Sequence, residues 1–213
     1  MNERWGRWHT CGLCEQRYYG VVACALGWAC WKTYVDRPEA DWARRLAITE
    51  LGNGLSNSNN HGDALSVQEA ELSMERRNVS SEERVLAAQS NLANTYQMLG
   101  RFDEPLCARR DTYAGYMKLL GEAHEQTLIM AYNYASLLKR LNRLEEAQSL
   151  LRKTLPVARR VLSGSSKLTL SMKQMYGETL YLDDGATLDD LREAVTILED
   201  TERTARRVLG AAH

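Results

Sequence analysis

The chain has 213 residues, with 27 lysines and arginines against 28 aspartates and glutamates, for a formal net charge of −1. This balance gives no electrostatic reason to expect nucleic acid or an anionic membrane as the main partner. Hydrophobic residues make up 44% of the chain, which is ordinary for a globular protein. Three prolines and a single phenylalanine fit a helical chain better than a β-sandwich.

The N-terminal segment predicts neither a secreted nor a membrane-spanning protein. Residues 1–5 lack the apolar core of a signal peptide. The longest apolar run, Gly20 to Trp31, is shorter than the roughly 20 residues that a membrane helix needs. The five cysteines are an odd number and cluster near the N-terminus, which indicates free thiols rather than a disulfide framework. We therefore expect a cytoplasmic protein.

Residues 1–38 form a cysteine- and aromatic-rich segment. Between residues 20 and 35, small side chains alternate with large ones, which predicts a helix that packs closely on a neighbour. Pro38 disfavours the α conformation at Arg37 and so predicts a helix boundary there.

Cys11 and Cys14 have the spacing of half a zinc site, whereas a structural zinc site needs four ligands. The stretch from Trp8 to Tyr18, with a tryptophan, a Cys-x-x-Cys and an aromatic, resembles the end of a RING-CH zinc finger. The resemblance implies that this pair would be the last two of eight ligands, and almost no chain lies upstream to supply the others.

Three interpretations of this cysteine pair stay open. It is a truncated finger without a complete site, or a makeshift zinc site, or a pair of reduced cysteines in a hydrophobic cap. The makeshift site would combine Cys11 and Cys14 with two of His9, Cys24 and Cys30. We expect less than one equivalent of zinc and no other cofactor.

Helical hydrophobic spacing continues from residue 40 almost to the end. It predicts four helical hairpins within residues 39–213, at about 40–78, 84–120, 127–162 and 168–209. Their helices are expected at 40–56 and 62–78, 84–99 and 102–120, 127–141 and 143–162, and 168–182 and 187–209. Thr187 and Asp190 form a capping pattern for the last helix.

The hairpins repeat in sequence. Asn91-Leu92-Ala93 returns 42 residues later as Asn133-Tyr134-Ala135, and the turn that begins at Gly100 returns at Asn142 with the same offset. A period of this size is typical of stacked helical units. The small residues Ala93 and Ala135 are expected to be buried where two helices meet.

The repeat resembles the tetratricopeptide repeat (TPR). The shared features are the small residues at Ala93 and Ala135, the Gly or Asn at the turn, and the aromatic or leucine that follows. The longer period and the Leu-Gly-x-x-His link at residues 120–124 resemble the kinesin light chain type. The resemblance implies an all-α, right-handed solenoid of about four hairpins behind a cysteine- and aromatic-rich cap. The same link recurs at residues 209–213, so we expect a fragment that stops at a repeat boundary.

The sequence predicts a non-enzymatic protein. It contains no Gly-rich phosphate loop, no G-x-S-x-G elbow and no H-E-x-x-H motif, and its four histidines are scattered.

Stacked hairpins form a groove lined by the first helix of each hairpin. Asn and Gln in such a groove both donate and accept hydrogen bonds, which suits a peptide backbone. In TPR domains that grip peptides, asparagines at the positions of Asn91, Asn94 and Asn133 have this role. The first hairpin is expected to add Thr49, Asn53 and Ser56, and the fourth Gln174, Glu178 and Tyr181. The main predicted peptide-binding residues are Ser90, Asn91, Asn94, Gln97, Tyr132, Asn133, Ser136 and Lys139.

The sequence thus favours an interaction scaffold that binds an extended peptide or a partner protein. Two alternatives stay open: a fragment of a RING-CH ubiquitin ligase that recruits substrate through its repeats, and a kinesin-light-chain-like cargo adaptor. The partner's identity and the oligomeric state are left undetermined.

Overall fold

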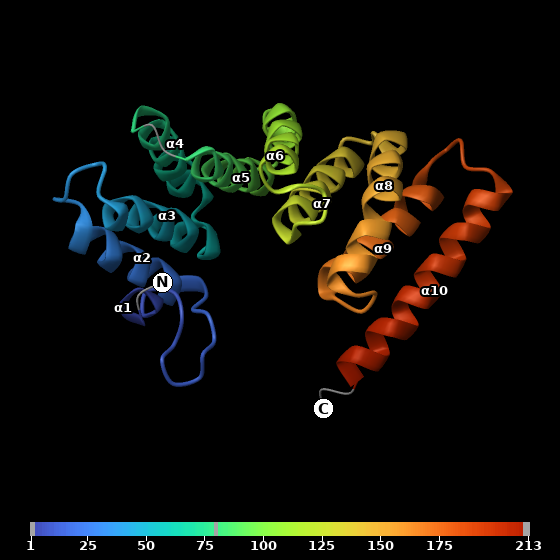
Figure 1. Ribbon diagram of the computed structural model, residues 1–213, viewed down its shortest axis with the longest axis horizontal. Helices are drawn as coiled ribbons and strands as arrows, with labels where there is room; N and C mark the ends of the chain where they lie inside the picture. The colour runs from blue at the N-terminus through green and yellow to red at the C-terminus, as the bar shows by residue number, and fades with distance from the viewer. Residues whose placement is uncertain (1–2, 79–80, 211–213) are drawn as a thin grey trace. The chain divides into compact units, whose positions relative to one another are not determined.

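A computed structural model of the protein describes residues 3–78 and 81–210. These residues form ten α-helices and no β-strand, and one isolated β-bridge joins Thr10 to Arg17 (Figure 1). The predicted all-α class and the four TPR-like hairpins are therefore confirmed. The chain divides into two compact units, Met1–Ala108 and Arg109–His213, which we call unit 1 and unit 2.

Unit 1 holds the N-terminal segment, the first hairpin and the first helix of the second. Its helices are α1 (Glu3–Gly6), α2 (Gly20–Tyr34), α3 (Trp42–Asn57), α4 (His61–Arg77) and α5 (Glu82–Met98). Helix α6 (Pro105–Leu120) spans the division between the units. It begins about three residues later than predicted because Pro105, which has no N–H and a fixed φ, is suited to the first helical position.

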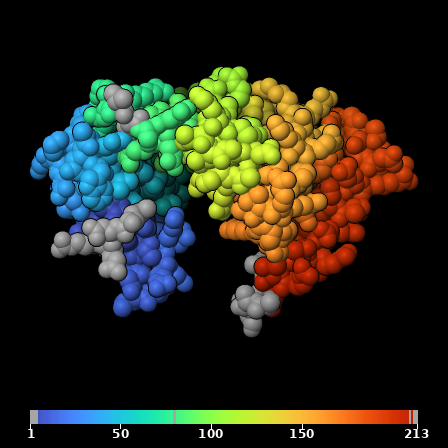
Figure 2. Space-filling view, viewed as in Figure 1, coloured from blue at the N-terminus to red at the C-terminus, as the bar shows by residue number. Residues whose placement is uncertain are grey.

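The N-terminal segment is built into the first hairpin. Trp5 of α1, Cys30 of α2 and Ala43 of α3 share one buried cluster. Helices α2 and α3 approach closely at two glycines: a Cβ on Gly27 would lie 2.9 Å from the Glu50 carbonyl oxygen, and Gly54 meets Ala23 in the same way. This confirms the close helix packing predicted for residues 20–35. Figure 2 shows the N-terminal segment, in blue, in direct contact with the hairpin.

A buried carboxylate joins three helices of unit 1. Glu75 of α4 has a side chain only 1% exposed, and it pairs with Arg45 of α3 and with Arg84 of α5. The Arg84 Nη2 atom lies 2.6 Å from Glu75 Oε1. Two arginines with several hydrogen bonds offset the cost of burying this charge, whereas removing it would leave both cations without their partner.

Unit 2 holds most of α6 together with α7 (Glu125–Arg140), α8 (Leu144–Leu162), α9 (Lys167–Leu182) and α10 (Leu188–Gly210). Its core includes Ala135 and Leu151, which are both 0% exposed. Ala93, the equivalent of Ala135 in the preceding repeat, is 1% exposed in unit 1. The prediction that both small residues are buried is confirmed.

The turns follow the sequence period. Gly100 and Asn142, which are equivalent in the repeat, have φ angles of +74° and +57°. Gly121 and Ser163 are equivalent at the following link, and their φ angles are +84° and +74°. Glycine and asparagine adopt a positive φ most readily. After Gly100 and Asn142, the next residue donates its N–H back to a helix carbonyl, Arg101 to Tyr96 and Arg143 to Leu138. The period thus fixes where the backbone reverses.

The predicted cap of the last helix is present. The Thr187 N–H donates to Asp190 Oδ2 at 2.9 Å, and the Asp190 N–H donates to Thr187 Oγ1 at 3.2 Å. Within the described residues, no helix is both long and apolar enough to cross a membrane. The end of the second link, Ala211 to His213, lies outside the described residues.

Candidate functional site

The candidate site is a cavity of about 680 Å³ in unit 1, between the first helices of the first two hairpins. Its walls are mainly polar and include six amide side chains. The lining residues are Arg17, Asn53, Ser56, Asn57, Asn59, His61, Gln68, Asn91, Asn94, Thr95 and Met98. We refer to it as the amide cavity.

Helical spacing places these groups on facing walls. Asn53, Ser56 and Asn57 lie three and four residues apart on α3 and therefore share one face. Asn91 and Asn94 do the same on α5. A hydrogen bond of 3.2 Å between the hydroxyl groups of Ser56 and Thr95 joins the two helices.

Gln68 of α4 contributes a buried amide to the cavity. It is 2% exposed, and its Oε1 atom has no hydrogen-bond partner among the described residues. Gly52 makes room for it, since a Cβ there would lie 3.1 Å from Gln68 Cγ. A buried carbonyl oxygen without a donor costs about 1–3 kcal/mol, so a ligand that donates a hydrogen bond to it gains that amount back.

The charges of the lining favour a neutral or partly negative ligand. Among the described residues that line the cavity, Arg17 is a cation and none is acidic. Glu71, on α4 like Gln68, is buried, and the Thr49 hydroxyl donates a hydrogen bond to it. Burial raises the pKa of Glu71 to about 7, against an opposing effect of this hydrogen bond. Thr49, which was predicted to face the groove, is therefore engaged with Glu71.

A second cavity of about 330 Å³ adjoins the amide cavity and shares Arg17, Asn53 and Asn57 with it. Half of its remaining lining residues are aromatic. They come from the N-terminal segment and α3, namely Trp5, Trp8, His9, Tyr18, Ala23, Leu46, Glu50 and Gly54. We refer to it as the aromatic pocket.

A carboxylate and an imidazole lie together in the aromatic pocket. Glu50 Oε1 lies 3.5 Å from His9 Nδ1. Burial raises the pKa of Glu50, and the charge of His9 together with a hydrogen bond from Trp5 acts in the opposite direction. A ligand in the amide cavity would therefore meet aromatic rings and a partly desolvated carboxylate at this end.

The other predicted peptide-binding residues of unit 1 are placed differently. Ser90 is 5% exposed and does not line the amide cavity. Gln97 is half-buried and also lies outside the lining. The structure thus brings together Asn53, Ser56, Asn91 and Asn94 out of the residues expected on these two helices.

In unit 2, the predicted residues lie on α7. Tyr132 lines a separate cavity of about 540 Å³ with Ser166, Leu168 and Ser171. Lys139 donates to Glu178 of α9, and Gln174 donates to the same carboxylate at 2.8 Å. Asn133 and Ser136 are half-buried. Lys139 and Glu178, both predicted to face a groove, therefore hold each other.

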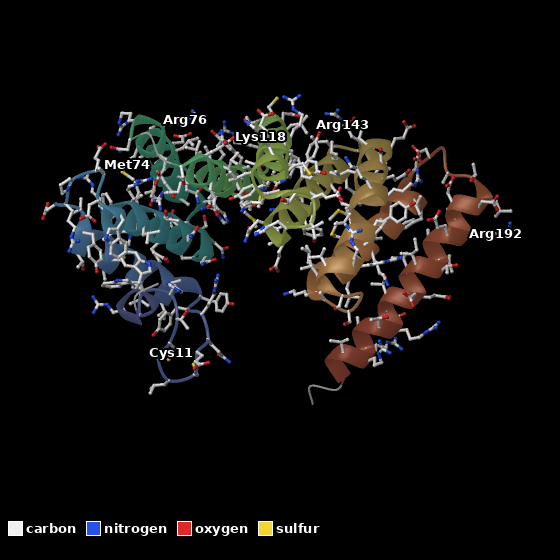
Figure 3. The ribbon with its side chains drawn as sticks, in the orientation of Figure 1. Cys11, Met74, Arg76, Lys118, Arg143 and Arg192 are labelled. Carbon is white, nitrogen blue, oxygen red and sulfur yellow. The ribbon has the colours of Figure 1, made fainter. Side chains whose placement is uncertain are left out.

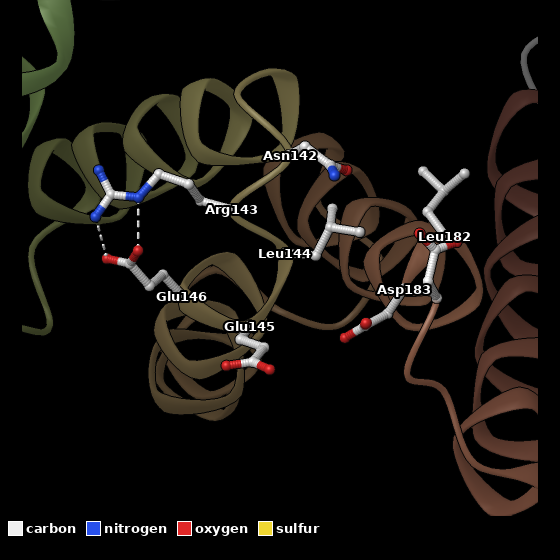
Figure 4. Close-up of a pocket in the computed structure, with 8 residues that line it drawn as sticks. Asn142, Arg143, Leu144, Glu145, Glu146, Leu182 and Asp183 are labelled. Carbon is white, nitrogen blue, oxygen red and sulfur yellow. Dashed lines mark hydrogen bonds and ion pairs between the residues drawn. The ribbon is translucent and has the colours of Figure 1, made fainter.

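Another cavity of unit 2 lies at the turn of the third hairpin, next to the end of α9 (Figure 4). Its main charged groups already have partners. The Arg143 guanidinium donates to Glu146 at 2.6 and 2.8 Å, and Asp183 accepts from Gln148. The Arg143 and Asp183 side chains of this cavity are therefore already engaged within the chain.

The makeshift zinc site does not form. Among the described residues, no three His, Cys, Asp or Glu side chains come together in a way that could hold a metal ion. Cys30 is 0% exposed in the cluster with Trp5, and burial raises the pKa of its thiol to about 12. A thiol in that environment is a core side chain rather than a metal ligand.

Cys11 and Cys14 themselves lie in a short turn between Thr10 and Arg17. Backbone N–H groups of Cys14 and Leu13 hydrogen-bond to the Cys11 sulfur and lower the pKa of the Cys11 thiol to about 7. The isolated bridge between Thr10 and Arg17 closes this turn. Among the described residues, no third or fourth ligand joins this pair.

The comparisons with known proteins agree with this architecture. Residues 84–160 match the family described as "Tetratricopeptide repeat". No curated protein matches the chain. The fold is therefore TPR-like over the described hairpins, and the match covers the second and third of them.

Solved structures extend the similarity to most of the chain. Two of them are crystal structures from Podosopora anserina, described as "kinesin light chain nearly identical TPR-like repeats". One of the two is a point variant, and their TM-scores are 0.69 and 0.68. Both are 18% identical and cover 88% of this chain and 85% of their own. BtubC (BKLC) from P. vanneervenii matches with a TM-score of 0.58 and 14% identity over 90% of this chain and 89% of its own. At these sequence identities, the similarity shows a shared fold and nothing about function.

The sequence analysis did not predict some of the residues that line the amide cavity. Asn57 and Asn59 were assigned only to a turn, and Gln68 and Arg17 were assigned no role. Gln68 lies on α4, the second helix of the first hairpin, whereas the predicted groove used only the first helix of each hairpin. One signal was available, since Asn57-Ser58-Asn59-Asn60 gathers three amides between two predicted helices.

Proposed function

We propose that this protein is a non-enzymatic interaction module that binds an extended peptide in the amide cavity. The peptide's backbone N–H and C=O groups would pair with the side chains of Asn53, Asn57, Asn91 and Asn94. Each amide both donates and accepts, so a row of them suits a backbone of any sequence. Backbone pairing supplies affinity, and neighbouring pockets supply specificity.

The observation that carries this proposal is the open hydrogen-bond acceptor of Gln68. Gln68 lines the cavity, and its Oε1 atom is buried and has no partner among the described residues. Such a group is a cost to the free protein. A peptide N–H that reaches this oxygen, after a small movement of the Gln68 side chain, would satisfy it on binding.

The aromatic pocket is proposed as the specificity end of the same site. It shares Arg17, Asn53 and Asn57 with the amide cavity. A peptide whose backbone lies along the amides would place a side chain among the rings of Trp8 and Tyr18. The residues predicted on α7, namely Tyr132, Asn133, Ser136 and Lys139, remain a separate proposed contact set.

The fold supports an interaction role because stacked helical hairpins present extended binding surfaces. The structural neighbours carry kinesin light chain descriptions, which favours the cargo-adaptor alternative over the ubiquitin-ligase alternative. A protein partner in the cytoplasm, with no nucleic acid or membrane involved, is part of the same proposal.

The test is a selection of random linear peptides displayed on phage against the intact chain, followed by titration of the selected peptides. Asn91→Ala and Asn94→Ala should each weaken binding by about fivefold, the equivalent of one hydrogen bond of about 1 kcal/mol. Gln126→Ala, an exposed amide on α7, is the control. Asn133→Ala asks separately whether α7 takes part.

Gln68→Met separates binding from folding. Removing the unsatisfied carbonyl should leave the melting temperature unchanged or higher, while it weakens the selected peptides. Peptides that bind the Asn91, Asn94 and Gln68 variants as tightly as the parent would show that the amide cavity is not the site.

A further inference from the structure

The aromatic pocket combines the two kinds of group that attract a cation. The rings of Trp5, Trp8 and Tyr18 line it, and Glu50 adds a carboxylate to the same lining. The face of an aromatic ring carries partial negative charge, so it attracts a cation, and more strongly where water is excluded. A carboxylate beside the rings adds the attraction of a full charge.

Backbone and core contacts hold the rings in place. The Tyr18 N–H donates to the His9 carbonyl at 3.0 Å and so joins the two sides of the turn whose Cys11 is labelled in Figure 3. Trp8 and Tyr18 therefore reach one pocket from the two sides of this turn. Trp5 is 4% exposed in the buried cluster that it shares with α2 and α3. The aromatic wall is thus formed in the free protein.

One ring of the pocket already carries a cation. The guanidinium carbon of Arg7 lies 4.6 Å from the centroid of the Trp8 ring. Arg7 is exposed and does not line the pocket. The Trp8 ring therefore attracts a guanidinium in this environment, and it does so without the pocket being filled.

The Glu50 carboxylate is only partly compensated. Its side chain is 21% exposed, and the His9 Nδ1 atom lies 3.5 Å away but makes no hydrogen bond among the described residues. Arg17 lines the pocket as well, but it is exposed, and charges in contact with water attract each other weakly. Burial raises the pKa of Glu50, which reflects the cost of holding this charge away from water.

We propose that the aromatic pocket takes a cationic side chain, a lysine or an arginine, of the peptide that is bound in the amide cavity. This inference rests on the proposed function, because it names the side chain that such a peptide places among the rings. The charge lies between the rings and Glu50, while Asn53 and Asn57, which line both cavities, connect it to the peptide backbone. A neutral side chain would take water from Glu50 without supplying a counter-charge, so the pocket discriminates against it.

The preference for a cation is confined to this pocket. The amide cavity contains Arg17 and no acidic residue among the described residues that line it. A second basic side chain along the amides would meet Arg17 without a carboxylate to offset the repulsion. We therefore expect a ligand with one basic residue flanked by neutral ones.

The first measurement uses the intact chain and those selected peptides whose binding is weakened by Asn91→Ala. Their lysines are replaced one at a time by norleucine and their arginines by citrulline, which keep the length of the side chain and remove its charge. One position should lose affinity on the order of tenfold, and the others little.

Glu50→Gln assigns that position to the pocket. The variant should weaken the unmodified peptide, and it should leave the binding of the norleucine or citrulline peptide unchanged. Such a coupling between two changes identifies groups that interact. Glu83→Gln, an exposed carboxylate on α5 that lines neither cavity, is the control.

A second measurement needs no selected peptide. Nα-acetyl-lysine methylamide and the matching norleucine and glutamate compounds are titrated into protein with isotope-labelled tryptophan, and the indole N–H signal that Trp8→Phe removes is followed by NMR. The lysine compound should shift this signal at the lowest concentration. Tyr18→Leu should weaken its binding about threefold through the loss of one ring.

The outcomes separate this inference from the proposed function. Peptides that depend on Asn91 but tolerate every removal of charge would overturn the cation site and leave peptide binding in place. Norleucine or glutamate compounds that bind as tightly as the lysine compound would overturn it as well. If no selected peptide depends on Asn91, the peptide function fails. The titration then decides, and a preference for lysine that Glu50→Gln abolishes would support the cation site.

Discussion

Gly54 of α3 lies directly against Ala23 of α2: a Cβ at position 54 would be 2.6 Å from the Ala23 carbonyl oxygen. Neither partner of this contact can move easily, because both atoms belong to helix backbones. The contact fixes how the N-terminal segment sits on the first hairpin, and Gly54 also lines the aromatic pocket.

Gly54→Ala should therefore destabilise the protein, although alanine is the better helix former. Forcing the two helices apart costs roughly 1–3 kcal/mol, as overpacking does elsewhere. The measurement is chemical denaturation of parent and variant. Gly62→Ala is the matched control, since nothing lies within 4 Å of a Cβ there. It should be neutral or slightly stabilising, by up to about 1 kcal/mol. Equal effects of the two substitutions would contradict the close approach.

Ala135→Leu should overpack the core of unit 2. Ala135 is 0% exposed and packs with Leu151 and Tyr176 in one cluster. The added carbon atoms should cost roughly 1–3 kcal/mol of unfolding free energy. Ala114→Leu on α6 places the same side chain at an exposed position and is the control. An Ala135→Leu variant that melts like the control would mean that the helix is rotated away from the observed register.

Glu71 should make stability depend on pH. Burial raises its pKa from the ordinary 4.5 to about 7 in the folded protein, with Thr49 and Arg84 opposing and the charges of Glu75 and Glu50 reinforcing the shift. A raised folded-state pKa means that the folded protein holds a proton that the unfolded chain releases. This contribution is complete below pH 4.5 and is lost as the pH rises to about 7.

Glu71→Gln removes this group, because an amide carries no titratable proton. The unfolding free energy of the variant, compared with the parent, should improve steadily between about pH 4.5 and 7 and then stay constant. Denaturation curves of both proteins across this range measure the difference. A difference that is flat with pH would show that Glu71 titrates normally.

Glu75→Ala should be among the most damaging single changes in unit 1. It leaves Arg45 and Arg84 without their shared carboxylate in a largely buried place. Breaking one side of a buried pair costs about 3–5 kcal/mol. Glu202→Ala, which breaks the exposed pair with Arg206 on α10, should melt like the parent. Similar melting of the two variants would show that the buried network contributes little.

Local signals in the sequence settled the helices and their turns. The 42-residue period placed Gly100 and Asn142 at equivalent turns, and both adopt the left-handed conformation. The alanines at 93 and 135 are buried as expected. These features depend on neighbours along the chain and on a periodic apolar face, so they can be read without knowing which helices meet.

The composition of the candidate binding surface depends on contacts between residues that are far apart in the sequence. The period indicated Asn91 and Asn94, but Gln68 entered the same cavity from a second helix, through the space left by Gly52. Lys139 was expected in the groove and instead holds Glu178. Pairing of this kind follows from which helix faces are brought together, which no local pattern records.

By itself, the sequence determined an all-α chain of four TPR-like hairpins and a pair of cysteines spaced for a metal. The tertiary structure decided that Cys30 is a core residue while Cys11 and Cys14 lie on a projecting turn. It also decided that the amides of α3, α4 and α5 enclose one cavity. The physical reason is that helix formation follows local hydrogen bonding and periodicity, whereas burial and partners are set by packing between helices far apart in the chain.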